Sequence, residues 1–164
     1  MGLWLELAAS GLITGGIYAL VALGLNLQYG LMRIMNISHG EFLMLGAYLT
    51  WLAHTMLGIN PVAFLPVVAI VLFLAGLLVY RLCFRRIART SPAVEIIEAR
   101  SLLIGFGLMY LVQNAAYLIW GADMRGYSFL ADPVEIAGAR FAANSLLAFG
   151  FAVAASLALL AVLR

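Results

Sequence analysis

The chain has 164 residues, of which 66% are hydrophobic and 10% are charged, and its formal net charge is +2. Soluble domains carry about 25% charged residues, so the composition excludes a soluble globular protein and indicates an integral membrane protein. The small net charge gives no sign of a nucleic-acid partner, and the single Cys83 excludes a disulfide within the chain.

Long uncharged runs, separated by short polar breaks, predict about five transmembrane helices in a single membrane domain. A span needs about 20 apolar residues. Asn60 and Pro61 predict the start of the third helix, because Asn is a good N-cap and Pro fits the first helical position. The predicted spans are about residues 7–30, 39–57, 61–81, 101–120 and 144–163. We therefore expect an all-α, polytopic membrane protein.

Arginines are concentrated in the connection between the third and fourth predicted spans. The positive-inside rule places such a connection in the cytoplasm. This orientation puts the N-terminus outside and Arg164 inside. Within the connection, Ser91-Pro92 followed by Glu95 predicts a short surface helix. The arginines are Arg81, Arg85, Arg86, Arg89 and Arg100.

The longest polar connection, residues 121–143, has charges that nearly cancel, as expected on the outer side. Residues 134–141 alternate around Gly138 and predict a small β-hairpin.

Most polar side chains near the apolar bulk lie in one stretch, residues 31–48. An ionisable side chain close to hydrocarbon is a functional hypothesis by default. A second interpretation stays open, because Ser38 and Glu41 have the spacing of a capping box, in which each side chain bonds a free N–H at a helix start. The region from Asn36 to Glu41 is either a cytoplasmic turn or a broken, re-entrant segment buried among helices.

Two further groups of residues are candidates for helix packing or for a polar route. Small residues let membrane helices approach closely. Gln113 and Asn114 either line a route or bond neighbouring helices, which is the more ordinary role. The glycines expected to pack helices are Gly11, Gly15, Gly16, Gly40 and Gly46.

A series of short motifs follows in close succession through the first third of the chain. With these motifs the chain resembles the N-terminal portion of the branched-chain amino-acid (Liv-type) ABC transporter permeases, including their urea and amide relatives. The resemblance continues more loosely through Ile104-Gly105 and Trp120-Gly121. Ile37 and Ser38 replace the usual Phe and Ala of the family pattern. The motifs are Gly15–Leu20, Ala22–Leu25, Tyr29-Gly30, Asn36–Glu41 and Gly46–Tyr48.

This resemblance implies a transport subunit in a bacterial-type inner membrane, with no ATPase activity of its own. It would work with a second permease subunit, two ATPase subunits that bind the ATP, and an extracytoplasmic solute-binding protein. Permeases of the family continue well past residue 164, so we expect this chain to be the front part of a longer permease. The candidates for the translocation pathway are Asn36, Ser38, His39, Glu41 and Gln113.

Two other functions stay open at this point. A proton-coupled secondary carrier would use titration of His39 and Glu41, although no second carboxylate pairs with Glu41 in the sequence pattern. A non-transporting assembly subunit would only pack against other spans. No catalytic residue and no metal or cofactor site is predicted, because the chain has neither H-E-x-x-H nor G-x-S-x-G. Leucine-like amino acids, urea and amides all remain possible solutes.

Overall fold

The computed structural model describes residues 2–90, 93–130, 132–136 and 139–163. The chain forms helices and a single two-stranded hairpin, which confirms the expected all-α class. Among the described residues, four helical segments are long and apolar enough to cross a membrane, and few of their side chains are buried within the chain. These segments are Glu6–Met32, Pro61–Thr90, Val94–Trp120 and Ala143–Val162. The helix His39–Leu57 is not among them, so its role as a fifth span stays a prediction.

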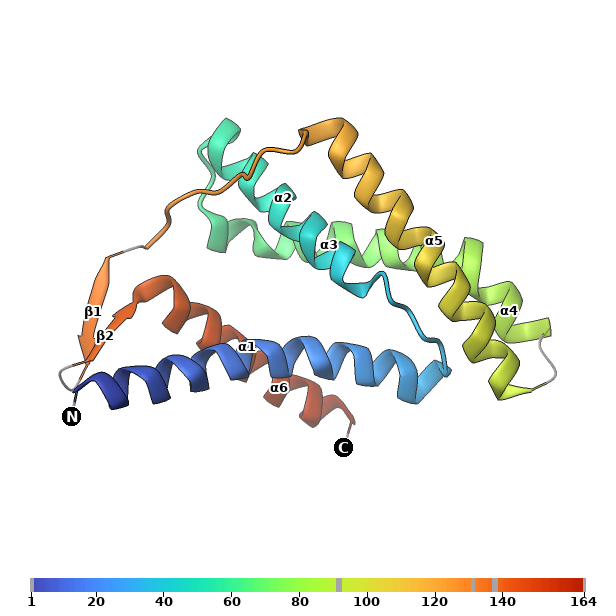
Figure 1. Ribbon diagram of the computed structural model, residues 1–164, viewed down its shortest axis with the longest axis horizontal. Helices are drawn as coiled ribbons and strands as arrows, with labels where there is room; N and C mark the ends of the chain where they lie inside the picture. Colours follow the sequence, from blue (N-terminus) through green and yellow to red (C-terminus); the bar gives the residue numbers. More distant parts are fainter. Residues whose placement is uncertain (1, 91–92, 131, 137–138, 164) are drawn as a thin grey trace. The chain divides into compact units, whose positions relative to one another are not determined.

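The chain divides into two compact units, residues 28–127 and residues 1–27 with 128–164. In the first unit, α2 (His39–Leu57) packs on α3 (Pro61–Val79), and both are seen in Figure 1. The helix continues from α3 through the π-helical turn η1 (Tyr80–Phe84) into α4 (Arg85–Thr90). The long helix α5 (Val94–Trp120) contacts both α2 and α4.

The turn between α2 and α3 follows the predicted helix signals. Asn60 Oδ1 accepts a hydrogen bond of 2.9 Å from the backbone nitrogen of Val62, and Pro61 is the first residue of α3. At the other end of the turn Gly58 has a φ of 65°, which glycine adopts without the steric penalty of a Cβ. The predicted N-cap at Asn60 is confirmed.

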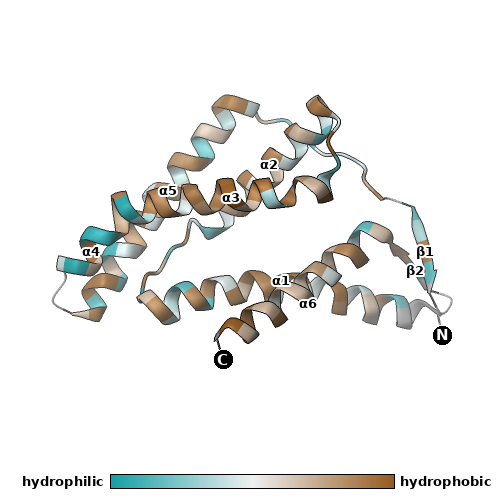
Figure 2. Ribbon diagram, turned by 180° about the vertical axis from the view of Figure 1, so that it is seen from behind, coloured by the Kyte–Doolittle hydropathy of each residue, from teal (hydrophilic) through white to brown (hydrophobic). Residues whose placement is uncertain are grey.

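The predicted short surface helix before the fourth span is wrong as a separate element. Residues from Val94 onward form one continuous α5 that ends at Trp120, and Ser91-Pro92 lies outside the described residues. Likewise, the helix that begins at Pro61 continues past Arg81 to Thr90. Charged residues mark where the apolar surface ends, but Arg and Glu are good helix formers and do not end the helix itself. Figure 2 shows this change of character, from apolar α3 to hydrophilic α4.

The second unit contains most of α1 (Gly2–Met32), β1 (Pro133–Ile136), β2 (Ala139–Ala142) and α6 (Ala143–Leu163). The two strands pair antiparallel, with Val134 opposite Phe141, which confirms the predicted hairpin. Gly138 lies outside the described residues.

The hairpin is tied to α1 by a polar contact. The backbone nitrogen of Arg140 donates to Glu6 Oε1 at 3.0 Å, and the Arg140 side chain forms an ion pair with Glu135 at 2.7 Å. Glu6 thus links the first turns of α1 to the strand that leads into α6.

Candidate functional site

The candidate site begins where α1 ends and the chain runs irregularly to α2. Arg33 has a φ of 53°, in the left-handed region that non-glycine residues rarely adopt, and this conformation turns the chain out of α1. Its guanidinium lies 5.4 Å from the centre of the Tyr29 ring, one turn earlier. The break therefore starts at a charged residue held against the last turn of its own helix.

Ser38 and Asn36 form the centre of the break. Ser38 is fully buried, and both its backbone nitrogen and its hydroxyl donate to Asn36 Oδ1, at 3.2 and 2.6 Å. This is a local side-chain turn of the kind that competes with helical backbone bonding. It defines the last irregular residues before α2.

The capping-box interpretation of Ser38 and Glu41 is wrong. Ser38 is the residue before α2, but its φ and ψ of −71° and 6° are not the extended values of a capping serine, and it makes no side-chain cap. Its hydroxyl is occupied by Asn36, and the Glu41 carboxylate accepts a bond from Gln113 instead. The spacing S-x-x-E is present, but the Ser38 hydroxyl donates to Asn36, and the Glu41 backbone nitrogen donates to the Ser38 carbonyl at 3.0 Å.

Helix α5 supplies the partners that the irregular backbone needs. Ser101, which is fully buried, accepts a hydrogen bond of 3.0 Å from the Met35 nitrogen and donates to the Glu98 carbonyl at 2.9 Å. A Cβ at Gly105 would lie only 2.9 Å from the Ile37 nitrogen, so the two backbones touch there. Non-helical backbone in a membrane protein is tolerated where protein surrounds it.

Sequence reasoning missed both Ser101 and Gly105 as parts of this site. A serine and a glycine four residues apart form a small-residue face, and that spacing was the available signal. Gly105 was noticed only as part of the family resemblance. The segment it contacts lies about 70 residues earlier, and no local pattern in the sequence identifies such a partner.

A cavity of about 430 Å³ opens beside the break. Asn36 and His39 face it, together with Gln28 from the end of α1 and Tyr80 from η1. The remaining wall is mostly apolar and comes from α2, α3 and η1. Two of the five predicted pathway residues, Asn36 and His39, thus line one cavity. Ser38 does not line it, but its two hydrogen bonds hold the Asn36 side chain.

The other two predicted pathway residues, Glu41 and Gln113, meet each other across α2 and α5. Gln113 Nε2 donates to Glu41 Oε1 at 2.8 Å, and neither residue lines the cavity beside Asn36. Asn114 instead donates to the Tyr110 carbonyl within its own helix. Among the described residues, therefore, Gln113 makes an interhelical bond and the bond of Asn114 lies within α5.

The glycines expected to pack helices differ in their surroundings. A Cβ at Gly16 would lie 2.5 Å from Phe149 Cε2, and one at Gly46 would lie 3.1 Å from Leu72 Cδ1. At Gly11, Gly15 and Gly40 an added Cβ would meet no atom within 4 Å among the described residues. A packing role for these three glycines stays a prediction.

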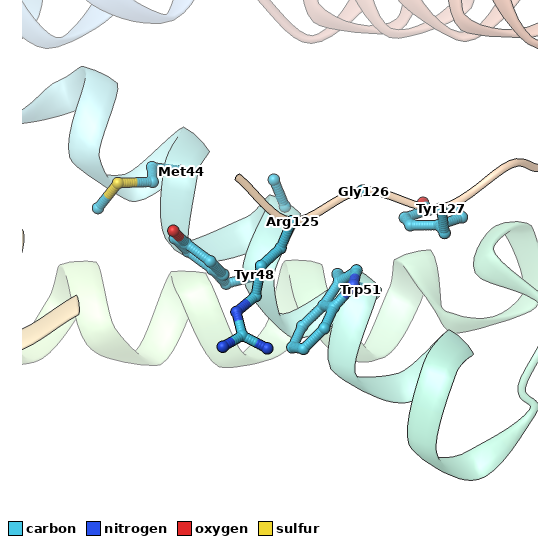
Figure 3. A pocket seen from close by; sticks show the side chains of 7 residues that line it. Met44, Tyr48, Trp51, Arg125, Gly126 and Tyr127 are labelled. Carbon is cyan, nitrogen blue, oxygen red and sulfur yellow. The ribbon is translucent and has the colours of Figure 1, made fainter. Parts of the chain in front are cut away.

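A second cavity, of about 370 Å³, lies between α2 and the segment that follows α5 (Figure 3). The Arg125 side chain reaches from that segment to lie between Tyr48 and Trp51. The Tyr48 ring stacks on Trp120 with centroids 4.5 Å apart, and the His54 ring lies 4.9 Å from that of Tyr127. Sequence reasoning did not find this cluster, although Trp and Tyr at span ends were visible in the sequence.

Comparisons with known proteins place this chain in a family. Residues 7–164 match the model of the branched-chain amino acid transport system permease component. The permease protein BraD of Pseudomonas aeruginosa, from a high-affinity branched-chain amino acid transport system, is 28% identical over 123 residues, which cover 70% of this chain and 38% of BraD. No solved structure matches the chain significantly.

Two proteins named LivH show the same relationship. The high-affinity branched-chain amino acid permease protein LivH of Escherichia coli K12 is 30% identical over 127 residues, covering 73% of this chain and 39% of LivH. A probable LivH of Methanocaldococcus jannaschii is 29% identical over 101 residues, covering 62% of this chain and 32% of that protein.

The chain belongs to the branched-chain amino acid transport permease family, and it is a multi-pass inner-membrane protein. The matched region spans less than two fifths of the length of each of these relatives.

Proposed function

We propose that this chain is part of the permease subunit of an ABC importer for branched-chain amino acids or related small polar solutes, including urea and amides. The relatives are transport subunits of branched-chain amino acid systems. ATP hydrolysis is then the work of partner ATPase subunits. One observation carries the proposal. In this chain, which belongs to the permease family, Ser101 of α5 bonds the irregular segment between α1 and α2, and a cavity lies beside that segment.

The cavity beside the break is proposed as part of the translocation route. Asn36 and His39 give it hydrogen-bonding groups, and the apolar wall suits an aliphatic side chain. The start of α2 has no side-chain cap, and the positive end of its dipole favours a carboxylate nearby. Discontinuous helices in other transporters present substrate sites in this way.

Glu41 and Gln113 are proposed as a second polar point on the route, between α2 and α5. Glu41 Oε1 accepts from the neutral amide of Gln113 at 2.8 Å and not from a cationic side chain, so an ammonium group is a suitable further partner. The proton-coupled alternative requires Glu41 to exchange protons with another titratable group. The hydrogen-bond partner of Glu41 is the amide of Gln113, which does not titrate, and this favours the ABC permease over the proton-coupled carrier.

The proposed assembly contains a second permease subunit, two ATPase subunits and an extracytoplasmic solute-binding protein. The apolar surfaces of α1, α3, α5 and α6 are largely unburied within the chain, so each needs lipid or another protein chain to cover it. The arginines of η1 and α4 support a cytoplasmic position for residues 81–90. By this orientation the N-terminus and residues 121–143 lie outside and Arg164 inside.

The experiment that tests the proposal is affinity purification of this polypeptide from its native membrane in mild detergent, followed by reconstitution into vesicles. We expect an ATPase and a second permease to be retained, and uptake of leucine to require ATP. Uptake driven by a proton gradient without ATP would make the protein a secondary carrier. Retention of partners that contain no ATPase, with no uptake, would make it an assembly subunit.

A further inference from the structure

The cavity at Arg125 is built from residues of the same compact unit, 28–127, and is called the Arg125 pocket. Its lining residues are Met44, Ala47, Tyr48, Trp51, Arg125, Gly126 and Tyr127. The pocket measures about 370 Å³, within the size range of small-molecule sites, about 300–1,000 Å³.

The guanidinium of Arg125 is held in place by two neighbours. Its Nε and Nη2 atoms donate to the Trp120 carbonyl at 3.2 and 2.8 Å, at the end of α5. The guanidinium carbon lies 5.0 Å from the centre of the Trp51 ring, at stacking distance. An arginine held in this way loses less conformational freedom on binding than a free one, because its planar fork is already oriented.

The positive charge of Arg125 has no carboxylate partner in the part of the chain that the structure describes. Nε and Nη2 donate to the Trp120 carbonyl, and Nη1 takes no part in these two bonds. Figure 3 shows the guanidinium between the Tyr48 and Trp51 rings, on the wall of the pocket. Guanidinium donors beside a pocket match the geometry of a carboxylate.

We propose that the Arg125 pocket binds the carboxylate of a small amphipathic solute, with the solute's aliphatic part against Met44 and Ala47. This inference rests on the proposed function for its solute class and for the outer position of the pocket. It adds a recognition point separate from the cavity at Asn36 and His39. A carboxylate on Arg125 would select amino acids over uncharged amides at this pocket.

A purely structural role for the cluster makes a different prediction. Trp and Tyr gather at membrane interfaces, and an arginine can bond the last carbonyls of a helix. Both roles would explain Trp51, Tyr48 and the bonds to Trp120. Neither gives any preference for a ligand that carries a carboxylate.

The experiment measures binding of radiolabelled leucine to the purified transporter complex in nanodiscs of zwitterionic lipid, without the solute-binding protein. Competition uses leucinamide, which lacks the carboxylate, and 4-methylpentanoate, which lacks the ammonium group. We expect 4-methylpentanoate to compete and leucinamide to compete at least tenfold more weakly. Arg125→Gln should remove this difference, and Arg125→Lys, which keeps the charge, should retain part of it.

Arg140→Gln is the matched control, because Arg140 lies in the same connection but already has Glu135 as its partner. It should bind leucine as the wild type does. Equal competition by leucinamide and 4-methylpentanoate in the wild type would overturn the inference. Loss of leucine binding when phosphatidylglycerol is added to the nanodiscs would also overturn it, since the site would then serve lipid phosphate.

The two proposals fail in distinguishable ways. ATP-dependent leucine uptake with no effect of Arg125→Gln on carboxylate competition would overturn the Arg125 site and keep the importer. Carboxylate binding that depends on Arg125, in a complex that shows no ATP-dependent uptake, would overturn the importer and keep the site.

Discussion

The Ser101 hydroxyl and the Met35 backbone nitrogen, 66 positions apart in the sequence, form a hydrogen bond of 3.0 Å. Ser101 also donates to the Glu98 carbonyl and is fully buried. A single side chain thus joins α5 to the irregular segment between α1 and α2. The position of Asn36 and His39 beside their cavity depends on this link, because Asn36 directly follows Met35 and His39 comes three residues after Asn36.

Ser101→Ala should destabilise the fold, because the Met35 nitrogen would lose its acceptor in a partly buried hydrogen bond. A typical intramolecular hydrogen bond contributes about 0.5–1.5 kcal/mol to stability. The measurement is thermal denaturation of the purified protein in detergent. Ser156→Ala is the control, since Ser156 bonds only the Ala152 carbonyl of its own helix at 2.7 Å. Equal melting temperatures for the two variants would show that the contact with Met35 contributes nothing.

Gly105→Ala should be harmful for a steric reason. The new Cβ would lie 2.9 Å from the Ile37 nitrogen, and backbone cannot move aside as a flexible side-chain end can. Overpacking of this kind costs about 1–3 kcal/mol. The control is Gly107→Ala on the same helix, where no atom lies within 4 Å of the added Cβ. That change should be neutral or slightly stabilising, because Ala favours helix by about 1 kcal/mol over Gly.

We expect yields of folded protein, measured by size-exclusion chromatography, to separate Gly105→Ala from Gly107→Ala. Similar yields would mean that α5 can shift away from the break at little cost.

How much of this site the sequence predicts depends on how local the interaction is. The N-cap at Asn60 and the hairpin of residues 133–142 depend on neighbours in the chain, and both were predicted. A turn or a broken segment near Asn36–Glu41 was predicted from its polar composition, and the irregular residues lie at 33–38. The bracing of this segment by Ser101 was not predicted, because small residues occur throughout membrane helices and the sequence does not say which of them face each other.

The capping box failed for a related reason. Its spacing is a local signal, but the Ser38 hydroxyl donates to Asn36 Oδ1 at 2.6 Å, and the Glu41 backbone nitrogen donates to the Ser38 carbonyl at 3.0 Å and not to the Ser38 side chain. The Glu41–Gln113 bond joins residues 72 positions apart, so the local sequence around Glu41 contains no sign of this partner.

Replacement of Glu41 separates its structural contribution from a role in transport. Glu41→Ala removes the 2.8 Å bond to Gln113, and interhelical hydrogen bonds in membranes average about 0.6 kcal/mol, so the loss of stability should be small. Glu41→Gln keeps an acceptor for Gln113 and removes the charge. If Glu41 lies on the route, uptake should fall more than protein level in both variants.

The control for Glu41 is Asn114→Ala, because Asn114 is on the same helix as Gln113 but bonds its own helix. It should leave both uptake and protein level near those of the wild type. Uptake and protein level that fall in parallel for Glu41→Gln would remove Glu41 from the route.

The contact between Gly16 and Phe149 predicts a pair of compensating changes. An added Cβ at Gly16 would lie 2.5 Å from Phe149 Cε2, so Gly16→Ala should destabilise the packing of α1 on α6 by about 1–3 kcal/mol. Phe149→Leu should relieve the clash, and the double variant should be more stable than the sum of the two single effects. Gly15→Ala, with no atom within 4 Å, is the control. Additive effects in thermal denaturation would show that the two side chains do not meet.

Asn36 offers a test in which structure and transport respond to different substitutions. Asn36→Ala leaves both donors of Ser38 without their acceptor, so it should lower the free energy of unfolding by about 1–3 kcal/mol. Asn36→Asp keeps that acceptor and should fold nearly as well as the wild type. It also adds a negative charge to the cavity, where it would repel a substrate carboxylate.

The measurement is ATP-dependent uptake of leucine and of urea by the reconstituted complex, normalised to protein level. We expect Asn36→Asp to reduce leucine uptake several-fold and to affect urea, which carries no carboxylate, much less. Asn60→Asp is the control, because it makes the same chemical change at a helix cap where Asp and Asn are equivalent and which lies away from the cavity. Unchanged leucine uptake in a well-folded Asn36→Asp variant would place the route elsewhere, since a charge on the wall of this mostly apolar cavity would act on a charged solute that passes it.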